Sequence, residues 1–564
     1  MPRQKPLVLN PAELNRASVH SETTSQETDM FARPDEMVEL LLATQPYSSD
    51  QWCRLSQSCI EEELAWFCSS KDGDTSASEH CWRALRLAYH AGYLLKTQDE
   101  QSIQRQENLL DALEGLCNSV TPTTSLQRVL LSCEIPLLVL GLQVETSRRL
   151  TDWHTIVKRL ASICDEDFDG EGMLASSDLG DFAEVLASIA RIIQLAGMGA
   201  LGPPLPKGIL NQFQWAVRQL LVICTADGHP FGAQSRQLSD DLVALLLKLG
   251  GDPSDVRLAH HLGFLSDSDR GFTADLAVRT KRPKASFHSE WAQVAVLRSG
   301  WGRNRRELGI SVNGTRVEVV LQSCGNPILL GEIEFALDVD GGYVEPAGKW
   351  IETCWQSDSD ADYLEMELEM TDGWRIQRQF CVSRRSGTVL IADVVLGTSI
   401  SDVRHTLKIG AAPDAMFSSA GEGLELLVES GNLIGLILPV GLPEWRTERG
   451  EGIRGDLIEA NGLELVSSGT KLSALYCPLF FALTPKAGNK QFTWRQLLVA
   501  KKLKCEAQDQ AAAARIQVGG RQWLLYRSLT EQANRTFMGQ NYASEFVFGE
   551  FLLDGKLKPY VEIG

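Results

Sequence analysis

The chain has 564 residues, and 54 Lys and Arg against 73 Asp and Glu give it a net charge of −19. A hydrophobic content of 44% and a charged content of 23% exclude a globally disordered chain. The length allows two to four domains at roughly 150 residues each. So acidic a chain lacks the positive field that holds phosphate backbones, and we therefore expect no nucleic-acid partner.

The sequence predicts neither a membrane span nor a signal peptide. Its most apolar stretch, Val129 to Leu142, carries Glu134 and Pro136 and is too short to cross a bilayer. The N-terminus has basic residues but no apolar core and no small-residue cleavage site. The 13 cysteines are scattered singly without a CxxC pair, which indicates reduced thiols in a cytoplasmic protein and no cofactor.

The first half of the chain has a helical period. Residues 1–33 are polar and read as a flexible leader, whereas residues 34–265 predict nine or ten short-looped helices packed as antiparallel hairpins. Thr124 to Leu142 is apolar nearly all round and predicts a buried helix kinked at Pro136. Apolar residues share one helix face in two further segments, Trp52 to Phe67 and Phe182 to Ala196.

Near residue 285 the period changes to two. Leu308, Ile310 and Val312 alternate with polar residues, and Asn313-Gly314 then predicts a two-residue hairpin turn. In Tyr363 to Met370 the glutamates fall on one face and the apolar side chains on the other. We therefore predict an α+β protein with a helical domain at 34–265, a linker at 266–287 and an antiparallel β domain at 288–564. That β domain is long enough for several sheets stacked face to face.

Four short strings occur in this order of domains. They are WAVR at 215–218 leading into TADGHP at 225–230, AVLRSGW at 295–301, the segment Phe335 to Gly348, and the segment Trp374 to Asp393. Together they resemble the bacterial heparinase II/III-like proteins. The resemblance implies an α/α toroid, here partial, followed by a β super-sandwich. It also implies a polysaccharide or oligosaccharide partner in the cleft between them.

The chain departs from that family's catalytic pattern. The family's lyases use adjacent Asn and His in the toroid and a Tyr in the toroid. They also use a His and an Asp that precede the strand corresponding to the one at Phe335 here. Here no Asn-His dipeptide occurs, and the stretch before Phe335 reads NPILLGEIE. We therefore expect a divergent glycan-binding or lyase-related protein whose β-elimination is weak, altered or lost. The alternative is a non-catalytic scaffold protein that reuses the fold.

Proton transfer in a lyase needs Tyr or His side chains beside the uronate carbon. The candidates are His229 in a Gly/Pro loop, Tyr89 and His90 on one predicted helix, His405 on a predicted strand, and Tyr343. We expect His405 and Tyr343 to face a cleft if they act, the latter at the domain junction. Core packing is the competing interpretation for Tyr89, and a structural role is the competing one for His405 and Tyr343. The resemblance also makes Arg298 and Trp301 candidates for substrate binding. Tyr93, which shares a predicted helix face with Tyr89, is a third candidate that would line a sugar cleft, with core packing as the competing interpretation.

Two charged segments remain. Asp165, Asp167 and Asp169, followed by Gly170, match the first half of a calcium loop, but Ser176 stands where a bidentate Glu belongs. A solvated acidic turn explains this segment better, and no metal is expected. The most basic neighbourhood lies near the domain boundary, where it would hold an anionic ligand or form a solvated face; it comprises Lys281, Arg282, Lys284, Arg303, Arg305 and Arg306.

Overall fold

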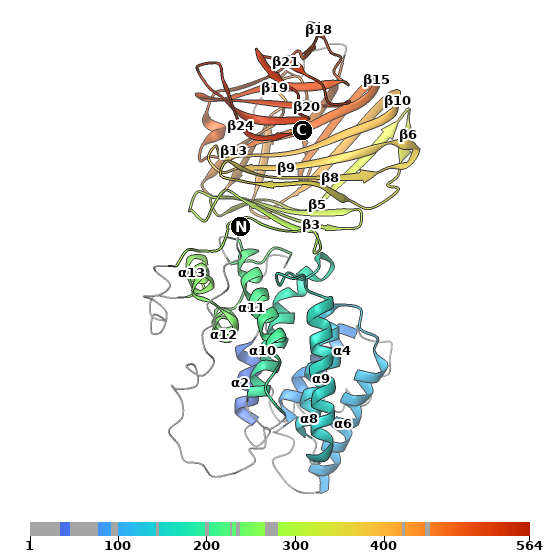
Figure 1. The fold of residues 1–564 in the computed structure, drawn as a ribbon, viewed down its shortest axis with the longest axis vertical. Helices are drawn as coiled ribbons and strands as arrows, with labels where there is room; N and C mark the ends of the chain where they lie inside the picture. The colour runs from blue at the N-terminus through green and yellow to red at the C-terminus, as the bar shows by residue number, and fades with distance from the viewer. Residues whose placement is uncertain are drawn as a thin grey trace.

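The computed structural model describes residues 34–44, 77–91, 100–142, 146–197, 202–225, 228–232, 237–265, 280–419, 423–445 and 452–564. A helical part and a sheet part lie end to end, with β3 next to the helices and β18 at the far end (Figure 1). The predicted leader, the Trp52 to Phe67 face and most of the predicted linker lie outside the described residues. The order of helices and then antiparallel sheets confirms the predicted fold class.

The helices of the described residues pack around one apolar core. A central helix, made of α7, η3 and α8, is surrounded by α4, α6, α9 and α10. Their bounds are α2 Pro34–Ala43, α4 Ala77–Tyr89, α6 Glu100–Ser119, α7 Ser125–Val129, η3 Leu130–Glu134, α8 Ile135–Leu142, α9 Thr146–Glu166, η4 Ser176–Asp181, α10 Phe182–Gly197, α11 Lys207–Val222, α12 Asp240–Gly250 and α13 Pro253–Leu262.

The central helix confirms the buried helix predicted for Thr124 to Leu142. Thr124 caps its first turn, and the segment Leu130–Glu134 before Pro136 is π-helical, with the Ile135 N–H bonded to the Leu130 carbonyl. Because proline has no N–H and its ring clashes with the carbonyl four residues earlier, a wider turn relieves the helix there. Among the described helices this one is long and apolar enough to span a membrane, but 83% of it is buried inside the protein, as in a core helix.

One long strand joins the layers of the sandwich. The first half of β10 (Thr388–Ala411) pairs with β9, and its second half pairs with β5. A register shift between Leu396 and Ser401 separates the two halves, where a bulge bends a strand from one layer into another. The sheet built on β10 therefore folds back on itself, and β2 packs against β8 and β9.

A separate sheet, in the order β16-β19-β20-β23-β24, forms a third layer. Tyr363 of β8 stacks on Phe546 of β23 at 5.1 Å between ring centroids. The next residue, Leu364, faces the opposite way and lines a cavity with Ala295 of β2. The predicted alternation of β8 is confirmed, and both of its faces are covered by other sheets.

The predicted hairpin at 308–321 is present as β3 and β4. Asn313 pairs with Arg316, so the two turn residues are Gly314 and Thr315, one position later than expected. Gly314 has φ +63°, the left-handed conformation that glycine adopts at low cost.

The strand bounds of the large sheet are β1 Phe287–Ser289, β2 Val294–Arg298, β3 Arg306–Asn313, β4 Arg316–Ser323, β5 Asn326–Val339, β6 Gly342–Val344, β7 Ile351–Ser357, β8 Ala361–Glu369, β9 Arg375–Ser383, β10 Thr388–Ala411, β11 Met416–Ser419, β12 Leu426–Ser430, β13 Leu433–Pro439, β14 Arg454–Glu459 and β15 Gly462–Ala482. Those of the smaller sheets are β16 Phe492–Gln496, β17 Ala500–Lys501, β18 Lys504–Cys505, β19 Ala511–Val518, β20 Arg521–Ser528, β21 Arg535–Phe537, β22 Gln540–Tyr542, β23 Phe546–Phe551 and β24 Leu557–Ile563.

Candidate functional site at the seam between helices and sandwich

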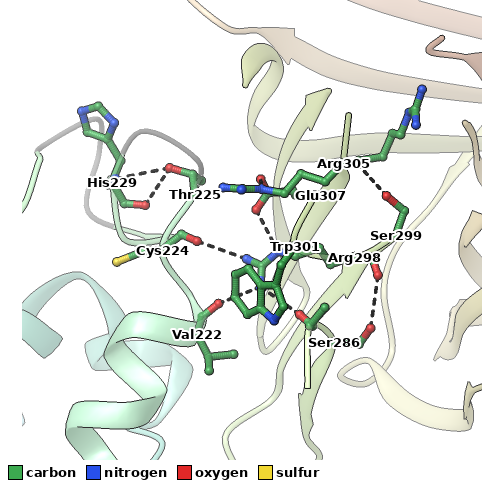
Figure 2. Close-up of polar contacts among 12 residues, drawn as sticks. Val222, Cys224, Thr225, His229, Ser286, Arg298, Ser299, Trp301, Arg305 and Glu307 are labelled. Carbon is green, nitrogen blue, oxygen red and sulfur yellow. Dashed lines mark hydrogen bonds and ion pairs between the residues drawn. The ribbon is translucent and has the colours of Figure 1, made fainter. Parts of the chain in front are cut away.

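Arg298 closes the seam between the two parts of the molecule. It ends β2, its side chain is 1% exposed, and its guanidinium donates to the carbonyls of Val222 at 3.0 Å and Cys224 at 3.1 Å (Figure 2). It also donates to Ala285 O at 2.8 Å and to the Glu307 carboxylate at 2.9 Å. The carbonyls at the end of α11 lack donors within the helix, and the Arg298 guanidinium supplies those donors.

Trp301 lies on the same guanidinium. Its ring centroid is 4.3 Å from the Arg298 guanidinium carbon, and its indole N–H donates to Pro283 O at 2.9 Å. The side chain is 8% exposed. The structure thus brings two of the three predicted substrate-binding residues together, but their contacts hold the seam closed. The third, Tyr93, lies outside the described residues.

A positive cluster surrounds these two residues. Arg305 and Arg298 both donate to Glu307, and Arg305 reaches the His261 ring nitrogen Nε2 at 3.4 Å. Burial, reinforced by the charges of Arg282 and Arg305, lowers the pKa of His261. Burial also lowers the pKa of Arg282, with Arg257 and Arg305 adding to the effect. These four arginines and Glu307 make a region of positive charge on an acidic protein.

Exposed cations extend this region to the surface. Lys281 and Lys284 precede β1, and Arg303 lies in the turn between β2 and β3; all three side chains are exposed. We name Lys281, Lys284 and Arg303 the basic rim. The sequence predicted these cations, but it did not predict their neighbours His261 and Glu307. Of the six cations predicted there, Arg306 is buried and donates to Leu483 O at 3.1 Å instead.

His229 sits in the loop after α11, close to the seam. Its carbonyl accepts from the Thr225 N–H and hydroxyl, both at 2.9 Å, and these bonds close the loop. Its imidazole points away from Arg298 and Trp301 in Figure 2. Its predicted role as an acid or base stays a prediction.

Tyr89 and His90 lie inside the helical core. The Tyr89 hydroxyl donates to Glu134 at 2.8 Å, and Arg191 binds the same carboxylate at 2.5 Å. Burial and the Glu134 charge raise the pKa of Tyr89 well above its usual value, so the phenol keeps its proton and is poorly suited to proton transfer. The His90 ring nitrogen Nδ1 is 2.8 Å from the Arg86 carbonyl. The packing interpretation of Tyr89 fits these contacts.

His405 and Tyr343 do not face the seam. His405 is on a strand, as predicted, but it is 0% exposed and its Nε2 lies 3.1 Å from Asp393. It occupies the sandwich interior rather than a cleft, because β10 is covered there. Tyr343 is 61% exposed on β6, which lies away from the helices (Figure 1), so the expected place at the domain junction is wrong.

The acidic loop after α9 binds protein groups. Asp167 pairs with Arg128, and one Asp169 oxygen accepts the N–H groups of Glu171 and Met173, each at 2.8 Å. The other Asp169 oxygen accepts from Ser289 of β1 at 2.6 Å, so the loop ties the helices to the sandwich. Asp165 lies in the last turn of α9. In the part of the chain that the structure describes, no group of three acidic, His or Cys side chains is placed to hold a metal.

The fold is that of the heparinase-like polysaccharide lyases. Over 84% of this chain and 79% of the other, it matches the crystal structure of a heparinase III with a TM-score of 0.58 at 11% identity. A second heparinase III matches over 88% and 80% of the two chains with a TM-score of 0.54 at 10% identity. The heparan sulfate lyase HepC from Pedobacter heparinus matches over 89% and 94% with a TM-score of 0.51 at 9% identity.

These matches are structural. No family model matches the sequence, and a search of curated proteins found no significant relative. The likeness thus establishes the fold, and the chemistry depends on the residues described above.

Proposed function

We propose that this protein binds an acidic polysaccharide at the seam through the basic rim, without cleaving it by β-elimination. The observation that carries the proposal is that the candidate side chains named next are engaged in contacts with other protein groups. Arg298 and Trp301 hold the seam together, Tyr89 holds a buried carboxylate, and His405 lies in the sandwich interior. A lyase needs such groups gathered around one carbon atom.

The binding half of the proposal rests on charge and on the fold. The basic rim adjoins the four arginines of the positive cluster, so a carboxylate or sulfate is attracted there despite the net charge of −19. The solved structures of this fold are named heparinase III and heparan sulfate lyase, enzymes of acidic polysaccharides. Ten described cysteines are free thiols, which supports a reducing compartment such as the cytoplasm as part of the proposal.

The test combines binding and cleavage on the full chain. Heparan sulfate, hyaluronan and dextran, the last as the neutral control, are titrated by calorimetry, and ultraviolet absorbance follows the release of unsaturated uronate. We expect binding of an acidic polysaccharide, weakened at least tenfold when Lys281, Lys284 and Arg303 are all replaced by Glu, and no rise in absorbance. A rise in absorbance would refute the loss of catalysis, and equal binding of dextran would refute the charge argument.

A matched variant controls for overall charge. Lys501, Lys502 and Lys504 lie on or between β17 and β18, at the end of the sandwich farthest from the helices (Figure 1). Replacing these three by Glu changes the net charge by the same amount. Binding that weakens equally in both triple variants contradicts a site at the seam.

A further inference from the structure

A cavity of about 190 Å³ opens between β1–β3 and β7–β8. It lies at the start of β2, whereas Arg298 ends that strand, so about 10 Å of extended chain separates the lining residue Ala295 from Arg298. At about 30 Å³ per water, the cavity has the volume of roughly six waters, the scale of a single sugar-sized ring. Its residues take no part in the side-chain contacts of Arg298 and Trp301 described above.

The cavity has an apolar floor and a polar rim. The rim carries Glu290 and Lys349, which are exposed, and Gln293, His288 and Glu352, which are partly buried. One cation against two carboxylates does not favour an anionic ligand. The floor is formed by Val294, Ala295, Ile310, Val312, Leu364 and Met366.

His288 is held in a fixed orientation at the rim. Its Nε2 lies 2.5 Å from the Glu352 carboxylate, and its ring stacks on Trp355 at 4.5 Å with an interplanar angle of 11°. A ring fixed on one edge and one face is preorganised to present its remaining edge. The second Glu352 oxygen is a hydrogen-bond acceptor in the same wall.

An exposed tryptophan belongs to the turn that carries two of the rim residues. Trp291 is 53% exposed and lies in the turn between the rim residues Glu290 and Gln293. An indole face accepts a ring that has an apolar side.

We propose that this cavity binds one neutral, hydroxyl-rich ring, the terminal sugar of an uncharged oligosaccharide, with the next sugar lying on Trp291. The C–H face of the ring contacts the apolar floor, and its hydroxyls bond to Glu352, Glu290 and the fixed His288. The site is separate in place and in ligand charge from the acidic-polysaccharide site at the seam.

Met366 gives a direct readout because its methyl group belongs to the floor. The full chain, with its nine methionines carrying ¹³C-methyl groups, is titrated with cellobiose, maltose and N,N′-diacetylchitobiose, and with glucuronic acid as the charged comparison. Met366→Leu assigns the resonance. We expect a saturable shift of the Met366 signal with at least one neutral disaccharide and none with glucuronic acid.

Two variants test the contacts. Trp291→Ala changes an exposed side chain, and Glu352→Gln keeps an oxygen for His288 while losing one acceptor for the sugar. We expect each variant to raise the dissociation constant of the sugar at least tenfold. The control is Trp445→Ala, which removes an indole that is 44% exposed elsewhere on the sandwich, and its dissociation constant should stay within twofold of the parent's. The proposal is overturned if no neutral disaccharide shifts Met366, if an apolar peptide alone shifts it, or if Trp291→Ala binds as tightly as the parent. Reversal of the basic rim leaves this binding unchanged, so the two sites fail or succeed separately.

Discussion

The guanidinium of Arg298 donates to the carbonyl of Val222 at 3.0 Å, joining the first long strand of the sandwich to the last residue of α11. Four of its five N–H groups are used by Val222, Cys224, Ala285 and Glu307. A residue placed where substrate was expected thus connects the two parts of the molecule. The contacts of the Arg298 side chain are with protein groups, so its place at the seam is that of a structural joint.

Arg298→Met should destabilise the protein strongly. The substitution leaves buried carbonyls at the end of α11 without a donor and removes one of the two cations on Glu307. Loss of one partner from a buried ion pair costs about 3–5 kcal/mol. Urea unfolding followed by circular dichroism measures this free energy. The control is Arg316→Met, because Arg316 is 72% exposed and 3.8 Å from Glu332; we expect a change there of about 0.5 kcal/mol or less. Equal effects of the two would contradict the joint.

The pKa of His261 should report the positive cluster. Burial comes first among the causes that lower it, and the charges of Arg282 and Arg305 act in the same direction. Arg282→Gln removes one of these charges, so the His261 pKa should rise toward its ordinary value. Titration of the histidine ring protons by NMR measures it. A fall in the pKa, or no change, would place Arg282 too far away to act.

The sequence predicted elements whose pattern depends on one face, and it missed contacts made through the backbone. The alternation at Leu308 to Val312 predicts a hairpin because only side-chain periodicity is needed. The partners of Arg298 are the carbonyls of Val222 and Cys224, which any residue supplies, so no residue pattern marks them. For that reason the sequence could not predict which part of the helical region Arg298 contacts.

Burial of charged residues was also beyond a pattern argument. The period of β8 places Glu365 on the face opposite Leu364, but it does not say that another sheet covers that face. In the structure Arg527 of β20 binds Glu365 there at 3.2 Å. In the same way, the sequence places His405 on a strand but does not reveal that it lies beside Asp393, the carboxylate that Arg378 binds.

The Glu365–Arg527 pair should be strongly coupled. Both side chains are buried, and Gln379 donates to the same Glu365 oxygen at 2.8 Å. Glu365→Leu alone leaves the buried Arg527 with the partly exposed Glu545, 2.9 Å away, as its remaining carboxylate. Because removal of one partner from a buried pair costs about 3–5 kcal/mol when the other charge is left alone, we expect a loss of about 3 kcal/mol or less here. The double variant Glu365→Leu with Arg527→Met removes both charges and should recover at least half of that loss. Additive losses in the double-mutant cycle would show that the two layers do not meet through this pair.

Asp393 should make the sandwich sensitive to acid. The Arg378 guanidinium, bonded at 2.7 and 2.8 Å, and the neighbouring His405 outweigh burial and hold the pKa of Asp393 far below its usual value. The unfolded chain takes up this proton near pH 3.9, so the stabilisation is fully present above about pH 4 and is lost as the pH falls further. Asp393→Asn should therefore cost about 3–5 kcal/mol at pH 7, and the difference from the parent should shrink steadily below about pH 4. Urea unfolding across this pH range measures both values, with Asp554→Asn as the control because that carboxylate is 54% exposed. A difference that stays constant down to pH 2 would mean that folding does not lower the pKa of Asp393.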